Sequence, residues 1–407
     1  MQTKTFTLSI VFLLIAGALF GQKTATTTSE DSLNNNLSKS STTIGGYGNA
    51  FYQRNSNLQT SKLDLERFVL FTGHKFNDKI SIFSELEVED AKVSGGEEGG
   101  EVAIEQAYLK FNLSANQYIV AGLFLPRIGI LNENHLPNTF NGNERNYVET
   151  VVLPSTWREL GIGLYGNLSN LPLNYSVGLV NGLSSAGFQH GSGIREGRFE
   201  GRNATGNNLA ITAALQFYQG NFIAQVSGYY GGTVGVSKSK ADSLGLNSGV
   251  FGTPVAIGEG DIQYSNNGFS VRALATIVSI PDASGINSAY ANNTPQTQYG
   301  AYAEIGYDLL HHKATRHEDQ FIIFVRDEKF NLNATIPSNG IADGTLNQNH
   351  IVTGFTYLPI KNVAIKADIR FIHTGKQNPD LIINPSPGTP AYQSNNNLVD
   401  LGMAFSF

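Results

Sequence analysis

The sequence predicts an all-β protein, a transmembrane antiparallel up-and-down β-barrel of 16 strands with short periplasmic turns and long extracellular loops. Three observations lead to this prediction. Only 15% of the 407 residues are charged, against about 25% in soluble domains. Segments of about ten residues alternate in polarity, and the connections between them are short and long in turn.

Composition narrows the class of protein further. The chain has 44 Gly, 24 Phe and 17 Tyr, and its apolar fraction of 41% is too low for a helical membrane protein. It has no Cys, so an exported form would not depend on disulfides. The net charge of −6 argues against a nucleic-acid partner, which would require a basic face.

The N-terminal residues 1–21 have the pattern of a signal peptide. Lys4 supplies the positive charge, and residues 8–20 are apolar. Ala16 and Ala18 are the small residues of one candidate cleavage site, and the Gly21–Gln22 bond is the second candidate. The apolar run is short for a membrane-spanning helix, which needs about 20 residues; an uncleaved anchor helix is the alternative. Residues 22–42 are polar and of low complexity, and we expect a flexible periplasmic leader. Residues 43–407 would form the barrel.

Strands are predicted wherever polarity alternates with a period of two. In residues 363–372, Ile365 and Ile369 fall on one face, whereas Lys366 and Asp368 fall on the other. The same reasoning places strands at 43–53, 62–76, 79–91, 101–113, 116–127, 157–166, 173–183, 207–218, 221–232, 258–265, 268–280, 297–309, 319–331, 347–358, 362–374 and 396–407.

Two strands change phase midway, at Glu66–Arg67 and at Glu105–Gln106, which predicts β-bulges. The last strand alternates up to Phe407. A terminal aromatic residue in this position resembles the signal by which outer-membrane barrels are recognised, so we expect the barrel-assembly machinery as a partner.

Sixteen strands are enough to leave an aqueous channel. The inner wall should then be polar, and both signs of charge would favour small polar or zwitterionic solutes over one class of ion. The residues predicted for the lumen wall are Glu85, Glu87, Lys110, Arg127, Arg158, Arg272, Glu304, Lys366, Asp368 and Arg370.

The third long loop, residues 128–156 and called loop 3 below, is the candidate constriction. It is long and rich in titratable side chains, and long ordered loops are usually functional. The predicted constriction residues are Glu133, His135, Glu144, Arg145 and Glu149. A loop on the outer surface is the alternative.

Two segments around loop 3 carry a family resemblance. Val120–Leu131 (VAGLFLPRIGIL) and Pro154–Gly166 (PSTWRELGIGLYG) resemble the phosphate-selective porin O/P-like family of outer-membrane porins. The resemblance implies a substrate-diffusion porin of sixteen strands, often trimeric. It also implies that Arg127 and Arg158 are cations of the wall or of the base of the loop.

Motifs of enzymes and metal sites are weak. Gly161–Gly166 matches G-x-G-x-x-G, but the turn at 167–172 follows where a dinucleotide site needs a helix. His311, His312 and His317 lie near Glu318 and Asp319, in what we expect to be a polar turn without fixed metal-ligand spacing. We therefore predict no catalytic residues, no cofactor and no metal.

Together these observations predict an outer-membrane porin of a Gram-negative cell, exported by its signal peptide. It would be surrounded by outer-membrane lipid and would pass small hydrophilic solutes or ions by passive diffusion, with a homotrimer as the candidate assembly. The alternatives are a plugged barrel acting in adhesion or in secretion and assembly, and an outer-membrane hydrolase.

Overall fold

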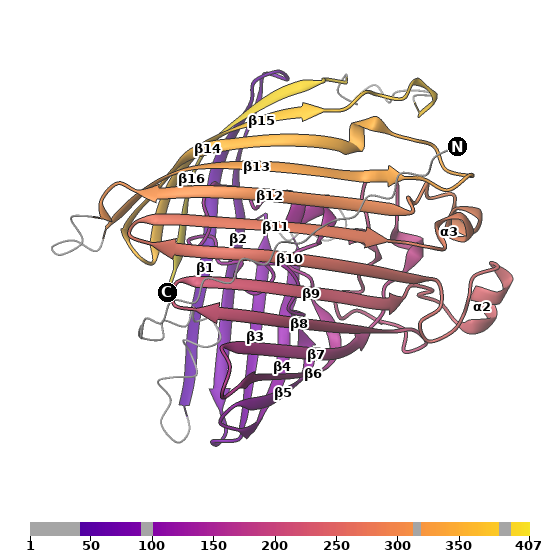
Figure 1. Cartoon of the computed structure of the whole chain (residues 1–407), viewed down its shortest axis with the longest axis horizontal. Coiled ribbons are helices and arrows are strands. Elements are labelled where there is room, and N and C mark those ends of the chain that lie inside the picture. The colour runs from indigo at the N-terminus through magenta and orange to yellow at the C-terminus, as the bar shows by residue number, and fades with distance from the viewer. Residues whose placement is uncertain (1–40, 91–100, 312–318, 382–391) are drawn as a thin grey trace, which may run out of the picture.

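The computed structural model describes residues 41–90, 101–311, 319–381 and 392–407. Within these ranges sixteen strands form one closed antiparallel barrel in which each strand pairs with its neighbours in sequence (Figure 1). The first strand pairs with the last, with Tyr47 opposite Ser406 and Asn55 opposite Leu398. The predicted signal peptide and most of the predicted leader lie outside the described residues.

The observed strands agree with the predicted ones to within a few residues at each end. The first strand begins at residue 41, two residues earlier than expected, and the tenth is longer than predicted. The strands are β1 (Ser41–Asn55), β2 (Thr60–Lys75), β3 (Ile80–Glu89), β4 (Val102–Ser114), β5 (Gln117–Phe124), β6 (Glu159–Leu168), β7 (Leu173–Asn181), β8 (Leu209–Gln219), β9 (Phe222–Gly232), β10 (Pro254–Asn266), β11 (Phe269–Ser279), β12 (Thr297–Asp308), β13 (Gln320–Thr335), β14 (Asn347–Ile360), β15 (Val363–Thr374) and β16 (Asn395–Ser406).

Both predicted β-bulges are confirmed. In β2 the register with β1 shifts between Asp64 and Arg67. In β4 the register with β3 skips Glu105, which lies between the paired residues Ile104 and Gln106. As a result Glu105 and Gln106 are both buried although they are adjacent in sequence, since a bulge re-aims one side chain.

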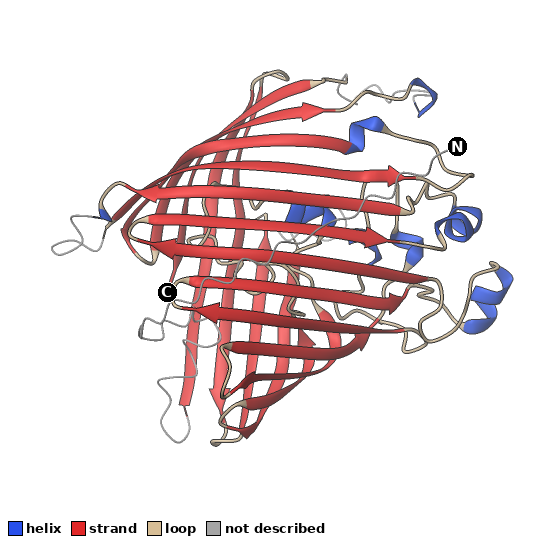
Figure 2. Cartoon of the chain, in the orientation of Figure 1, coloured by secondary structure: helices blue, strands red, loops and turns tan. Residues whose placement is uncertain are grey.

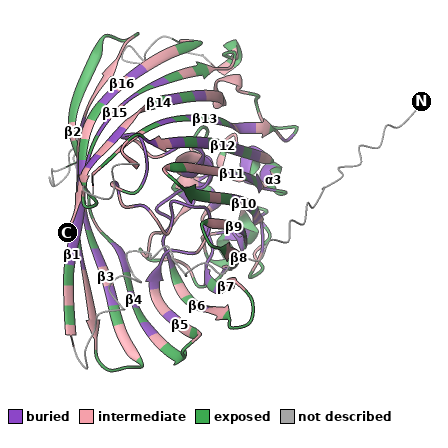
Figure 3. Ribbon diagram, turned by 60° about the vertical axis from the view of Figure 1, so that its left-hand side comes forward, coloured by how far each residue is buried: buried purple, intermediate pink, exposed green. Residues whose placement is uncertain are grey.

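Burial in the strands is the reverse of that in a soluble protein. In β15, Ile365 is 48% exposed, whereas Lys366 is 3% and Arg370 is 1% exposed. Exposed and buried residues alternate along the strands (Figure 3). The barrel therefore has an apolar outer surface and a polar interior, the arrangement that a lipid environment outside and water inside require.

Helical segments are short and lie in the connections. Most of them gather at one end of the barrel or inside it (Figure 2). They are η1 (Val148–Val152), η2 (Ser185–Gly187), η3 (Arg195–Gly197), α2 (Lys238–Ser243), α3 (Ala283–Tyr290), η5 (Gly344–Leu346) and η6 (Pro379–Leu381). Among the described residues, none of the helices is long and apolar enough to cross a membrane.

Candidate functional site

Loop 3 runs through the interior of the barrel. It belongs to the connection between β5, which ends at Phe124, and β6, which begins at Glu159. Non-strand segments are visible inside the ring of strands (Figure 3). Hydrogen bonds join loop 3 to inward-facing side chains of β11 to β15, as described below, so this segment is not a loop on the outer surface.

One lysine of the wall fixes the middle of loop 3. The Lys366 ammonium on β15 donates hydrogen bonds to the carbonyls of Pro137, Phe140 and Gly142, at 2.5, 2.8 and 2.8 Å. It also lies 4.2 Å from the centre of the Phe140 ring. The three carbonyls replace the hydrating water that the ammonium loses when it is buried.

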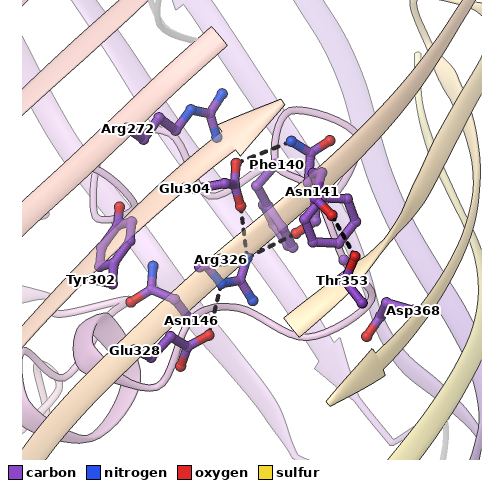
Figure 4. Close-up of polar contacts among 12 residues, drawn as sticks. Phe140, Asn141, Asn146, Arg272, Tyr302, Glu304, Arg326, Glu328, Thr353 and Asp368 are labelled. Atoms are coloured by element: carbon purple, nitrogen blue, oxygen red, sulfur yellow. Dashed lines mark hydrogen bonds and ion pairs between the residues drawn. The ribbon is translucent and has the colours of Figure 1, made fainter. Parts of the chain in front are cut away.

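Two carboxylates of the wall bind the asparagines that follow. Asp368 accepts hydrogen bonds from the backbone and the side chain of Asn143, both at 2.8 Å. Glu304 on β12 accepts one from Asn141 at 3.0 Å. Arg326 on β13 pairs with Glu304 at 3.0 Å and donates to the Asn141 carbonyl. Figure 4 shows Arg326 between the wall and loop 3.

Glu149 is the internal hub of loop 3. It lies in η1 and is buried. One carboxylate oxygen accepts the backbone N–H groups of Ile130 and Leu131, at 2.7 and 2.6 Å. The other accepts from Asn146 at 3.0 Å and from the Tyr302 hydroxyl on β12 at 2.7 Å. Glu149 therefore ties both ends of loop 3 to each other and to the wall.

Arg370 on β15 makes a further attachment between loop 3 and the wall. Its guanidinium lies 3.4 Å from Glu328, 3.5 Å from Glu144 and 4.4 Å from the centre of the Tyr147 ring. The Tyr147 backbone N–H donates to Glu328 at 2.7 Å. Charge pairs and a cation–π contact thus complete the contacts that attach loop 3 to β12–β15.

On the opposite side, loop 3 leaves open space. A cavity of about 630 Å³, called the channel cavity below, lies between loop 3, the strands β1 to β4 and loop 4 (residues 184–206). Both signs of charge line it. The basic residues are Lys62, Arg67, Arg145, Arg158, Arg195, Arg198 and Arg202, and the acidic ones are Asp64, Glu66, Glu87, Glu89, Asp90, Glu101, Glu144, Glu196 and Glu200.

Loop 4 holds its arginines against the end of loop 3. Arg195 donates to the carbonyls of Thr150 and Ser155, both at 3.1 Å. Arg198 donates to the Pro154 carbonyl at 3.0 Å and pairs with Glu200 at 2.7 Å. Burial, together with the neighbouring Arg195, lowers the pKa of Arg198 to about 10. The side chain still carries its charge at neutral pH.

The predicted site residues divide into three groups. Those lining the channel cavity are Glu87, Glu144, Arg145 and Arg158. Those covered by loop 3 are Glu304, Lys366, Asp368 and Arg370, and Arg272 joins them through a hydrogen bond to the Thr139 carbonyl. Those held elsewhere are Glu85, His135 and Glu149, which are buried, the pair Arg127–Glu133 at 2.7 Å, and Lys110, whose ammonium lies 3.9 Å from the centre of the Tyr118 ring.

The burial of His135 and Glu149 differs from the position expected of constriction residues. Each is only 1% exposed, so neither presents its charge to the channel cavity. Their position follows from hydrogen bonds. The Glu149 carboxylate accepts three from loop 3 and one from Tyr302 on β12, and His135 contacts the Asn132 carbonyl.

Sequence reasoning missed several cavity residues. On β2, Lys62, Asp64 and Arg67 line the cavity, and the bulge obscured which of them face inward. In loop 4, the run REGRFEGR at 195–202 contributes three arginines. Five charged residues in eight, in a chain where 15% of residues are charged, were the sequence signal that could have identified loop 4 as a functional loop.

The positions of the dinucleotide-like and histidine motifs can be compared with the sequence-based expectations. The G-x-G-x-x-G match at 161–166 is part of β6, and the next element along the chain is the strand β7, not a helix. Of the histidine cluster, only His311 and Asp319 are described, and the remainder lies outside the described residues.

No known protein-family profile matches the sequence. A protein of Aquifex aeolicus (strain VF5), described as uncharacterized, is 30% identical over 356 residues, covering 84% of this chain and 78% of its own. This chain belongs to the same family.

Solved structures share the fold at low sequence identity. An anion-selective porin from Comamonas acidovorans superposes with a TM-score of 0.52 at 12% identity, covering 91% of this chain and 100% of its own. The outer-membrane channel DcaP of Acinetobacter baumannii gives 0.52 at 15% identity, with 91% and 98% covered. OmpF of Salmonella typhi gives 0.51 at 13% identity, with 90% and 97% covered. The chain therefore has the fold of outer-membrane porins.

Proposed function

We propose that this protein is an outer-membrane porin, a passive channel for small hydrophilic solutes, and not an enzyme. The observation that carries the proposal is the course of loop 3. It is fastened to β12–β15 by buried charges and leaves the channel cavity against β1–β4. A barrel of sixteen strands is wide enough for an aqueous channel, and loop 3 would set its narrowest width.

The charges around the channel cavity suggest the kind of solute. Arginines and carboxylates line it together, and charges of both signs around a narrow channel would create a transverse field. Such a field orients polar molecules and favours those with both charges over simple ions of one sign. Small polar or zwitterionic solutes are therefore the proposed cargo class.

Conductance in planar bilayers tests the proposal. The purified protein should give ohmic steps, and Arg145→Gln should change the step size and shift the reversal potential toward cations. Lys329→Gln is the matched control, since Lys329 is exposed on β13 and is not among the residues lining the cavity. Absence of conductance would favour a plugged barrel. If Arg145→Gln left step size and reversal potential unchanged, loop 3 would not lie in the conducting path.

Finer proposals follow from the resemblance to the phosphate-selective porin O/P-like family. A homotrimer is supported by a solved neighbour described as a trimer form, with a TM-score of 0.50. Cross-linking in detergent tests this assembly. Export to the outer membrane and assembly through the strand ending at Phe407 remain proposals of the same kind.

A further inference from the structure

A cluster of metal-ligand side chains lies at the start of loop 3, apart from the channel cavity. Glu85 on β3, Glu105 on β4 and His135 in loop 3 each place one ligand atom within 4.8 Å of the others. All three are buried, at 0%, 0% and 1% exposed. The cluster therefore joins loop 3 to the wall opposite its attachments on β12–β15.

The β-bulge of β4 places Glu105 in this cluster. It brings Glu105 and Gln106 to the inner face together. Gln106 donates a hydrogen bond to Glu85 at 2.7 Å, and the Tyr47 hydroxyl donates to Glu105 at 3.1 Å. Both carboxylates are thus held by neighbours, as the outer shell of a metal site holds its ligands.

The hydrogen bonding of His135 leaves one ring nitrogen as an acceptor. Its Nδ1 lies 3.1 Å from the Asn132 carbonyl, which can only accept, so Nδ1 carries the hydrogen. In the neutral ring Nε2 then presents a lone pair, and it has no hydrogen-bond partner among the described residues. It faces carboxylate oxygens of Glu85 and Glu105 at 4.0 and 3.8 Å. Acceptors that face one another in a buried space are stabilised by positive charge between them, and a metal ion supplies it.

We propose that Glu85, Glu105 and His135 bind one divalent transition-metal ion, with Zn²⁺ as the best fit. Bonds of about 2.1 Å in a tetrahedral shell put ligand atoms about 3.4 Å apart, so the side chains would move together by about 0.4 to 1.4 Å from the observed spacing of 3.8, 4.0 and at most 4.8 Å. Three protein ligands leave the fourth position for water. Two carboxylates balance the charge of the ion.

The nearby arginines are compatible with a bound cation. Arg67 is engaged by Glu66 at 2.7 Å and by Glu87 at 3.9 Å. Arg145 lies within electrostatic range of Glu105 and Glu66. Glu66 and Glu87, which are not among the proposed ligands, therefore offset positive charge of these arginines beside the cluster.

The inference goes beyond the proposed function. Loop 3 is fixed to β12–β15 by hydrogen bonds and ion pairs, and Thr156 contacts Glu105 on β4. The metal would add a direct link from His135 to β3 and β4. A metal at this point would fix the position of loop 3 from both sides and so keep the width of the channel cavity constant.

Zinc titration of the full-length protein in detergent tests the inference. The protein, without an affinity tag, is stripped with a chelator and titrated with ZnCl₂ by calorimetry at neutral pH, and metal per chain is measured by mass spectrometry. We expect one Zn²⁺ per chain, and affinity at least about tenfold weaker in His135→Gln and Glu105→Gln. His190→Gln is the control, because within the described part of the chain His190 contacts one carboxylate, that of Asp343, at 2.8 Å.

Three results would overturn the inference. They are the absence of stoichiometric binding by the wild type, equal binding by His135→Gln, and equal loss in His190→Gln. If the ligand variants fail to fold by circular dichroism, Co²⁺ replaces Zn²⁺ on the wild type. Tetrahedral d–d absorption bands would then support the site, and the spectrum of the free aqueous ion would refute it.

Discussion

Replacing Glu149 by Gln should loosen the fold of loop 3 and its contact with β12. The carboxylate accepts four hydrogen bonds, two on each oxygen. An amide keeps one oxygen and turns an N–H₂ group toward two donors, so two bonds to a charged acceptor are lost. At about 1.5–3 kcal/mol each, the hydrogen bonding that holds loop 3 in its fold and to Tyr302 weakens by about 3–6 kcal/mol. Even about 3 kcal/mol raises the population of the loosened loop about 150-fold.

Single-channel recording measures the effect of Glu149→Gln. We expect larger and noisier conductance steps, because the loosened loop moves within the lumen. Tyr302→Phe removes one of the four bonds and should give a smaller change in the same direction. Asp327→Asn changes the charge equally at an exposed residue of β13 and serves as the control. If Glu149→Gln matches the wild type in step size and noise, the hub assignment is wrong.

Three further predictions concern the same structure. Lys366→Met removes three hydrogen bonds to loop 3 and should widen the conductance distribution, whereas Lys329→Met should not; identical distributions would contradict this. Raising the pH through 10 neutralises Arg198, so the reversal potential of the wild type should move toward that of cations near pH 10. A shift of equal size in Arg198→Gln would show that Arg198 is not the titrating group. Gly300→Ala places a Cβ 2.8 Å from Val148 and should destabilise loop attachment by about 1–3 kcal/mol, measured by thermal unfolding, unlike Gly258→Ala, whose Cβ meets its nearest atom at 3.9 Å.

The strands were predictable because their signal is local. Alternation in β15 shows in the sequence which residues share a face, and the burial of Lys366 and Asp368 follows that pattern. The bulges at β2 and β4 were also visible as phase changes. What alternation cannot tell is which partner an inward residue meets, because Lys366 contacts carbonyls more than 220 positions away in sequence.

The candidate site was predictable in composition but not in geometry. Loop 3 was recognised by its length and charges, yet His135 and Glu149 turn inward to bind the loop and the wall. Loop 4 was not expected to reach the cavity at all. A loop has no repeating pattern, so its path depends on contacts formed only once the barrel has closed.

The sequence alone determined the barrel, with its strands, its apolar outer surface and its polar, charged interior. The reason is that alternation with a period of two residues already assigns side chains to two faces. The tertiary structure alone decided where loop 3 rests, which side of the lumen stays open, and that Glu85, Glu105 and His135 meet. Those features join residues from distant strands, and only the closure of the sheet brings such residues within bonding distance.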